Sequence, residues 1–123
     1  VIDLSGQSPG LLFALGASNI GRPWFGGGYP GSFDYVALSL ARAPCKQLAE
    51  GWILTEPDGP RSISHDVTKS FGGDLSSDYH LASAWMTSEE AGGYKRQRKQ
   101  YFYKPSRPEV IAASCEALRN AIR

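Results

Sequence analysis

Apolar residues recur at helical spacing in the last part of the chain, where the sequence predicts its longest helix. Four of them, separated by four, three and four positions, share one helix face: Ile111, Cys115, Leu118 and Ile122. Ser106 can accept from the N–H groups of the first turn, and Glu109 can complete a capping box. Pro108 suits the first turn, where a missing N–H is tolerated. The pattern predicts a helix from Ser106 onward that buries its stripe against a sheet.

A second helical pattern follows residue 32. Its apolar positions recur at helical spacing: Phe33, Val36, Ala37, Leu40 and Ala41. Ser32 is the predicted cap. Pro44 interrupts this helix or starts another turn, and Gly51 ends the helical region.

Shorter patterns predict strands. Residues 1–4 and 52–56 are apolar enough for short strands, and the residues Pro57-Asp58-Gly59-Pro60 predict a turn. Residues 61–68 alternate apolar and polar side chains, which predicts a returning strand. Residues 77–91 fit a helix or a strand. We favour the strand because Gly92-Gly93 predicts a turn into the next strand, at residues 94–104. The prediction is a single α+β domain over residues 1–123, with an antiparallel sheet of about four strands packed against a helix in the N-terminal half and the C-terminal helix.

The net charge of +1 hides two oppositely charged regions. Residues 1–93 contain five Lys or Arg and ten Asp or Glu, whereas residues 94–123 contain eight and two. Positive charge concentrated in one segment points to an anionic partner.

The segment 94–107 is the main candidate binding site. It has no acidic residue, and its basic and aromatic candidates are interleaved: Lys95, Arg96, Arg98, Lys99, Tyr101 and Tyr103. One interpretation is a lysine-rich edge strand that prevents aggregation. The other is contact with an acidic protein surface, or with nucleic acid through phosphate contacts and base stacking. No nucleic-acid-binding motif supports the latter.

A glycine-rich stretch at residues 16–31 contains three aromatic residues that are candidates for binding: Trp24, Phe25 and Tyr29. Loops with exposed aromatic residues often carry binding sites. An ordered loop whose aromatic side chains enter the core is the alternative. The stretch lacks the spacing of a phosphate-binding loop.

Cys45 and Cys115 are the two cysteines. Two buried thiols in a cytoplasmic protein are one interpretation. We predict instead a disulfide in a secreted or periplasmic protein, worth roughly 4 kcal/mol in the chain-entropy description. Neither cysteine has a Cys or His at ligand spacing, so we predict no metal and no cofactor.

His65 and His80, with Glu56, are weak candidates for acid–base catalysis, and Arg98 could supply a cation for a ribonuclease-like site. The sequence does not bring these residues together. No motif of a nucleophilic serine is present. We therefore predict a small non-catalytic interaction domain, such as an effector, an inhibitor or an immunity-type protein, that binds a protein or an anionic polymer. A nucleic-acid-binding protein or a ribonuclease-like hydrolase is the alternative.

Overall fold

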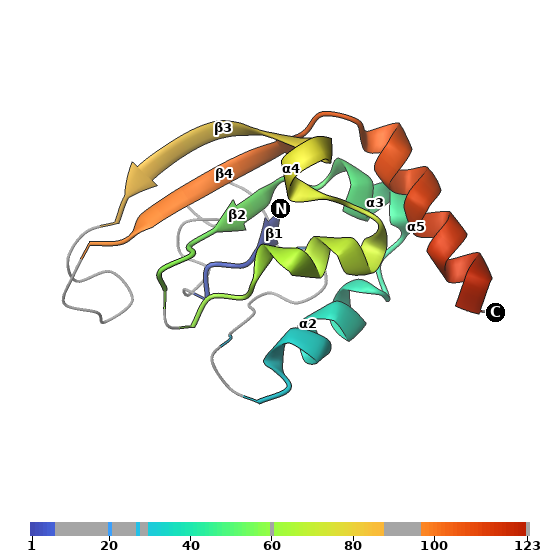
Figure 1. Ribbon diagram of the computed structural model, residues 1–123, viewed down its shortest axis with the longest axis horizontal. Coiled ribbons are helices and arrows are strands. Elements are labelled where there is room, and N and C mark those ends of the chain that lie inside the picture. The colour runs from blue at the N-terminus through green and yellow to red at the C-terminus, as the bar shows by residue number, and fades with distance from the viewer. Residues whose placement is uncertain (7–19, 21–26, 28–29, 60, 88–96, 123) are drawn as a thin grey trace.

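The computed structural model of the chain describes residues 1–6, 20, 27, 30–59, 61–87 and 97–122. In chain order the elements are β1 (Ile2–Asp3), α2 (Ser32–Leu40), α3 (Cys45–Glu50), β2 (Ile53–Thr55), the 3-10 helix η1 (His65–Phe71), α4 (Leu75–Asp78), β3 (Tyr79–Met86), β4 (Lys99–Pro105) and α5 (Pro108–Ile122). Figure 1 shows the long strands β3 and β4 extending past the helices on the left of the view. The predicted α+β fold with four strands is confirmed.

The four strands form one sheet in the order β1-β2-β4-β3. β4 runs antiparallel to both β2 and β3. β1 runs parallel to β2, because the chain between them crosses over through α2 and α3. The sheet is thus mixed, with one parallel pair beside the predicted antiparallel ones. A register irregularity between Leu81 and Ser83 interrupts the pairing of β3 with β4.

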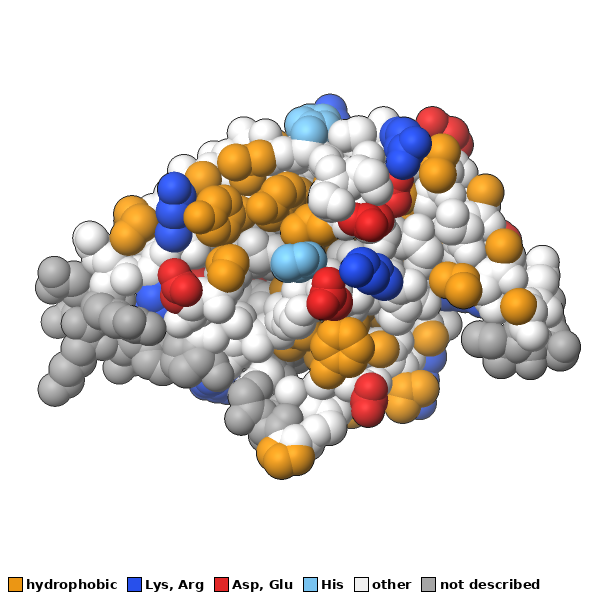
Figure 2. All heavy atoms as spheres, in the orientation of Figure 1, with side chains coloured by type: hydrophobic (Ala, Val, Ile, Leu, Met, Phe, Trp, Pro, Cys, Tyr) orange, Lys and Arg blue, Asp and Glu red, His pale blue; other side chains and the backbone are white. Residues whose placement is uncertain are grey.

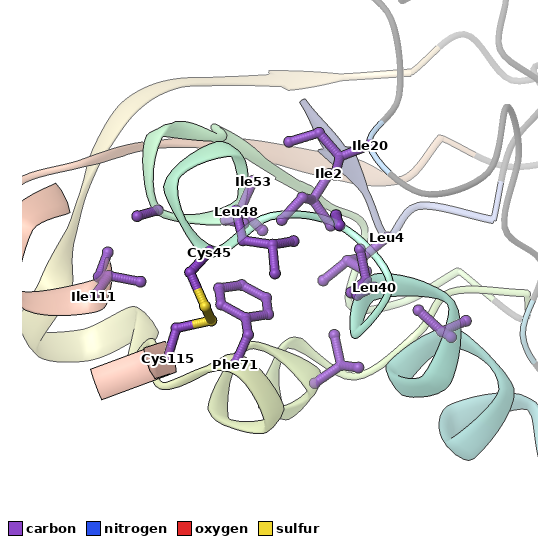
Figure 3. Packing of buried hydrophobic residues seen from close by; sticks show 14 of the residues in the cluster. Ile2, Leu4, Ile20, Leu40, Cys45, Leu48, Ile53, Phe71, Ile111 and Cys115 are labelled. Atoms are coloured by element: carbon purple, nitrogen blue, oxygen red, sulfur yellow. A yellow bond between two sulfur atoms is a disulfide. The ribbon is translucent and has the colours of Figure 1, made fainter. Parts of the chain in front are cut away.

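The hydrophobic core lies between the helices and the β1–β2 part of the sheet (Figure 3). Ile2 and Ile53 enter it from the strands, and Leu40 and Leu48 from α2 and α3. Ile111 enters it from α5, so the C-terminal helix packs against the sheet through this common core. Each such side chain contributes roughly 1.5–3 kcal/mol when fully buried.

A disulfide joins α3 to α5. Cys45 and Cys115 are bonded across a sequence separation of 70, with their Cα atoms 5.7 Å apart. Figure 3 shows the bond beside the ring of Phe71. Next to it, Gly72 has a φ of +88°, and an added Cβ would lie 2.7 Å from the Cβ of Ser114, so glycine lets η1 approach α5 closely. The predicted disulfide is confirmed, and it is compatible with an oxidising compartment.

The predicted strand at residues 61–68 is wrong. The chain instead forms η1 from His65, capped by Ser64, whose hydroxyl accepts from the N–H of Asp66. The hydroxyls of Thr68 and Ser70 donate to backbone carbonyls three residues earlier, which favours a helical turn over a strand. The buried apolar residues also recur at a spacing of four: Ile63, Val67 and Phe71. An alternating pattern in a short segment concealed this helical period.

The predicted helix ends need correction. Gly31 occupies the N-cap of α2, so Ser32 is the first helical residue rather than the cap. α5 begins at Pro108, and the Ser106 hydroxyl lies 2.7 Å from Nδ1 of His80 instead of capping the helix. The predicted apolar stripe of α5 is buried at Ile111 and at the disulfide, but Leu118 is 42% exposed, because α5 extends past its neighbours there.

Candidate functional site

β4 carries most of the described candidate binding residues and is an interior strand. It pairs with β2 along one side and with β3 along the other. The interpretation of the basic segment as a protected sheet edge is therefore wrong for residues 99–105. β3 returns antiparallel beside β4 and is itself the edge strand.

We call one uncovered surface of β3 and β4 the open sheet face. It consists of six residues that share a face because they are paired or alternate along their strands: Leu81, Ala84, Met86, Lys99, Tyr101 and Tyr103. Tyr103 also pairs with the core residue Ile53, so the open sheet face continues the surface that the helices cover. Leu81 is 51% exposed and Met86 is 53% exposed. Figure 2 shows hydrophobic side chains gathered over these two strands.

Two tyrosines form the centre of the open sheet face. The rings of Tyr101 and Tyr103 are stacked, with centroids 6.4 Å apart and an interplanar angle of 28°. Nζ of Lys99 lies 5.3 Å from the Tyr101 centroid, within reach of a cation–π interaction. Partial burial raises the pKa of Tyr103, and the neighbouring Tyr101 raises it further. The Tyr103 phenol therefore offers a neutral hydroxyl group above an apolar surface.

The opposite face of the same strands has a different aromatic group. The ring of Phe102 lies 5.0 Å from that of Trp52 and 6.3 Å from that of Trp85. Nζ of Lys104 lies 5.6 Å from the Trp52 ring. Since Lys99 belongs to the open sheet face and Lys104 to the other, the two exposed lysines of β4 do not converge on one surface.

A binding role for the segment 94–107 requires Arg98 on the surface, and the structure contradicts this placement. The Arg98 side chain is 1% exposed, and its Nε lies 3.1 Å from Oε2 of Glu56, whose side chain is fully buried. Gln100 donates to the other Glu56 oxygen over 3.0 Å and accepts from the indole of Trp85 over 2.8 Å. This buried network links the end of β2 to β4 and β3. A guanidinium held in this way is not offered to an external partner.

The catalytic candidates do not form one accessible group. His65 lines a pocket of about 300 Å³ together with Thr55, Glu56, Pro57, Ser62, Ile63 and Ser64. The Glu56 carboxylate is buried in the network just described, so it cannot accept a proton from a bound substrate without exposure. His80 lies outside this lining and is bonded to Ser106 at the start of β3. The structure brings Glu56 and His65 near one pocket but does not add His80 or Arg98 to it.

Five predicted binding residues lie outside the described residues: Lys95, Arg96, Trp24, Phe25 and Tyr29. The Gly92-Gly93 turn lies outside them as well. Arg107, at the end of the basic segment, is described and pairs with Asp78 over 2.5 Å. Of the cations from residue 97 to residue 107, only Lys99 therefore joins the described tyrosines on the open sheet face.

Sequence reasoning missed three residues of this surface, namely Leu81, Ala84 and Met86 of β3. An apolar alternation begins at Tyr79 and Leu81, but the next position of that alternation is Ser83. The register irregularity after Leu81 shifts the alternation by one residue, so that Ala84 and Met86 continue the face. Allowing one inserted residue in the period-two pattern would have found them.

The described part of the chain contains neither a metal-binding cluster nor a membrane-spanning helix. No group of three or more His, Cys, Asp or Glu side chains there could hold a metal ion. None of the described helices has both the length and the apolar character needed to cross a bilayer. In comparisons with known proteins, no family model, no curated protein and no solved structure matches the chain.

Proposed function

We propose that this protein is a non-catalytic interaction domain that binds an acidic, partly apolar segment of another protein on the open sheet face. The exposure of large apolar side chains on that face carries the proposal. Leu81 and Met86 are each about half exposed beside the partly buried rings of Tyr101 and Tyr103. Contiguous exposed apolar groups mark interaction surfaces, and tyrosine and methionine are enriched in them.

The charge of this region favours an acidic partner. β3 and β4 contain no Asp or Glu, and Lys99 lies at the end of the open sheet face that the helices leave uncovered. In the sequence, Lys95 and Arg96 precede β4 by only a few residues. A partner with carboxylates beyond its apolar side chains would complement this arrangement and associate faster at low salt.

The distribution of cations favours a protein over a nucleic acid. A nucleic acid presents regularly spaced phosphates and needs several cations directed toward one groove. Among the described residues of the basic segment, Arg98 is buried, Lys104 belongs to the opposite face and Arg107 pairs with Asp78. One lysine beside an apolar surface is typical of a protein interface, where the centre is apolar and the rim charged.

The environment of the catalytic candidates supports a binding role over a hydrolytic one. The carboxylate of Glu56 is engaged by Arg98 and Gln100 away from solvent. His80 makes its hydrogen bond at the opposite end of β3 from Lys99. With the disulfide between Cys45 and Cys115, we further infer that the protein works outside the cytoplasm, in a secreted or periplasmic setting.

Selection of peptides tests the proposal. Random peptides displayed on phage are selected on the immobilised protein, and the enriched sequences are synthesised for titration. We expect enrichment of Asp or Glu next to apolar residues. Leu81→Ser and Met86→Ser should each weaken binding by about tenfold or more, equivalent to about 1.4 kcal/mol.

Two matched controls make this experiment specific. Leu38 of α2 is 67% exposed and lies outside the open sheet face, so Leu38→Ser should leave the affinity unchanged. Lys99→Gln should weaken binding and its salt dependence, whereas Lys104→Gln should do neither. No enriched peptide, or binding that is indifferent to changes at Leu81 and Met86, would refute the proposal.

The nucleic-acid and hydrolase alternatives are tested beside it. Fluorescence anisotropy with single-stranded RNA and with heparin at two salt concentrations should give no affinity comparable to that of the peptide. Incubation with RNA, DNA and simple esters should give no turnover. Turnover that disappears in His65→Ala or His80→Ala would replace the binding proposal with an enzymatic one.

A further inference from the structure

The outer edge of β3 is a second surface with its own chemistry. β3 is the last strand in the order β1-β2-β4-β3, and no described strand pairs with its outer side. From His80 to Ala84 every residue is exposed, and so is Met86. Figure 1 shows no described element beyond β3. An edge strand of this kind presents backbone N–H and C=O groups that can pair with another strand.

This edge lacks the charged side chains and prolines that protect many natural edge strands. Many natural edge strands carry proline or charged side chains such as lysine, which prevent pairing with a further chain. β3 contains none of these over Tyr79–Met86, with His80 as its one titratable side chain besides Tyr79. A β-bulge can also blunt an edge, and the register irregularity between Leu81 and Ser83 interrupts the regular strand at that point only. The longest regular stretch therefore runs from Ser83 to Met86, and hydrogen bonds between Thr87 and Arg98 extend it.

The neighbouring side chains define what this edge would accept. A strand added beside β3 would place every second side chain next to Ala84 and Met86, on the open sheet face. At the same end, Lys99 pairs with Met86 in the sheet register. An extended segment with apolar residues at alternate positions and a carboxylate at the Lys99 end complements both features.

We propose that the outer edge of β3, from Ser83 to Thr87, binds an extended acidic segment of another protein as a fifth strand of the sheet. This inference rests on the proposed function and adds the mode of recognition: backbone hydrogen bonds supply affinity, and the open sheet face selects the alternate side chains. The partner is a peptide segment with period-two alternation, rather than a helix laid across the face.

A pair of proline variants tests the edge with the peptide selected above. Consecutive N–H groups of a strand point to opposite sides, so one of Ser83 and Ala84 donates toward β4 and the other toward the open edge. Of Ser83→Pro and Ala84→Pro, one should lower the melting temperature strongly. The other should keep it close to that of the parent and still weaken peptide binding by about tenfold or more.

A second measurement covers the case in which both proline variants unfold. The peptide is synthesised twice, with N-methyl groups on alternate amides in either register. One version should lose binding by about tenfold or more, while the other binds like the unmodified peptide. Amide hydrogen exchange should slow at alternate residues from Ser83 to Thr87 when the unmodified peptide is bound.

The possible results separate this inference from the proposed function. If the folded proline variant and both methylated peptides bind normally while Leu81→Ser does not, the edge proposal is wrong and the face proposal stands. If no peptide is selected, both are wrong. A concentration-dependent dimer in sedimentation that the folded proline variant abolishes would assign the edge to a second copy of this chain and overturn the inference.

Discussion

The β1–β2 end of the sheet is covered by helices, and the β3–β4 end is open on the same side. At the covered end, Ile2 and Ile53 are completely buried in a core that the disulfide ties together. At the open end, Leu81 and Met86 are each about half exposed on the continuation of that surface. The leucine at the open end is about as apolar as the isoleucines at the covered end. Burial therefore depends on which strands the helices reach. The covered end therefore supplies stability, and we assign binding to the open end.

Arg98 and Lys99 show the same contrast between neighbouring residues. The Arg98 side chain turns into the molecule and pairs with Glu56, whereas Lys99 is exposed beside Tyr101. In the sequence both are members of one basic run. Because side chains of consecutive residues along a strand point to opposite faces, adjacent charges can have unrelated roles.

We expect the largest difference in the free energy of unfolding between variants of Arg98 and variants of Lys99. Arg98→Met leaves the Glu56 carboxylate buried without its cation, which should lower the free energy of unfolding by about 3–5 kcal/mol. Lys99→Met should change it by less than about 0.5 kcal/mol, because exposed charges stabilise little. Urea unfolding measures both. Combining Arg98→Met with Glu56→Gln should recover part of the loss, and a double variant no better than the single would argue against charge burial as the cause.

The disulfide should contribute nearly as much to the free energy of unfolding, and it joins helices at the covered end only. Replacing Cys45 and Cys115 with alanine should cost roughly 4 kcal/mol, because the bond closes a long loop in the unfolded chain. Denaturant unfolding of the parent with and without reductant should give a matching loss, while peptide binding to the folded variant should be kept. Alkylation of two thiols in the unreduced, denatured protein would contradict the bond itself.

Replacing leucine with alanine at the covered end and at the open end should cost different amounts of stability. Leu48→Ala removes a completely buried side chain and should cost roughly 3 kcal/mol, including the cavity that remains. Leu81→Ala removes a side chain that is 51% exposed and should cost less than about 0.5 kcal/mol. Thermal unfolding compares the two. A similar loss at both positions would mean that the open sheet face is covered in solution.

The smallest effect concerns pH and the buried carboxyl of Asp3. Burial raises its pKa, the charge of Glu56 raises it further, and hydrogen bonds from Ser5 oppose the rise. Since its folded pKa lies above the unfolded value of about 3.9, the unfolded chain releases this proton first. Stability is therefore lost as pH rises from about 4 toward the folded pKa. Asp3→Asn should remove that loss, so its stability relative to the parent protein should rise above about pH 4.

Asp74 provides a control of opposite sign. Hydrogen bonds from the side chain and backbone of Ser76 hold its pKa below the usual value. Its contribution to stability is therefore present above about pH 4 and is lost as pH falls through the folded pKa. Urea unfolding between pH 2 and pH 7 should show Asp74→Asn losing stability where Asp3→Asn gains it. Parallel profiles for the two variants would contradict the assigned causes.

Local chemistry made several elements predictable. The spacing of four between Ile111 and Cys115 identified the helical face that is buried, and Gly51 marked the end of α3. Proline and glycine at residues 57–59 predicted the turn after β2, where the N–H of Gly59 donates to the carbonyl of Glu56. These features depend on neighbours within one or two turns of the chain, so the sequence contains them directly.

The sequence by itself therefore determined the α+β class, the positions of the two longest helices and of most strands, and the placement of Cys45 and Cys115 on helical segments. Only the tertiary structure decided that β4 is interior, that Arg98 is buried against Glu56, and that Leu81, Met86 and Lys99 share an open face. The reason is that strand order and sheet coverage depend on contacts between residues far apart in the chain. Glu56 and Gln100, separated by 44 positions, meet only after β2 and β4 have paired. A periodic pattern specifies which side of a strand is apolar, but not whether a helix will lie upon it.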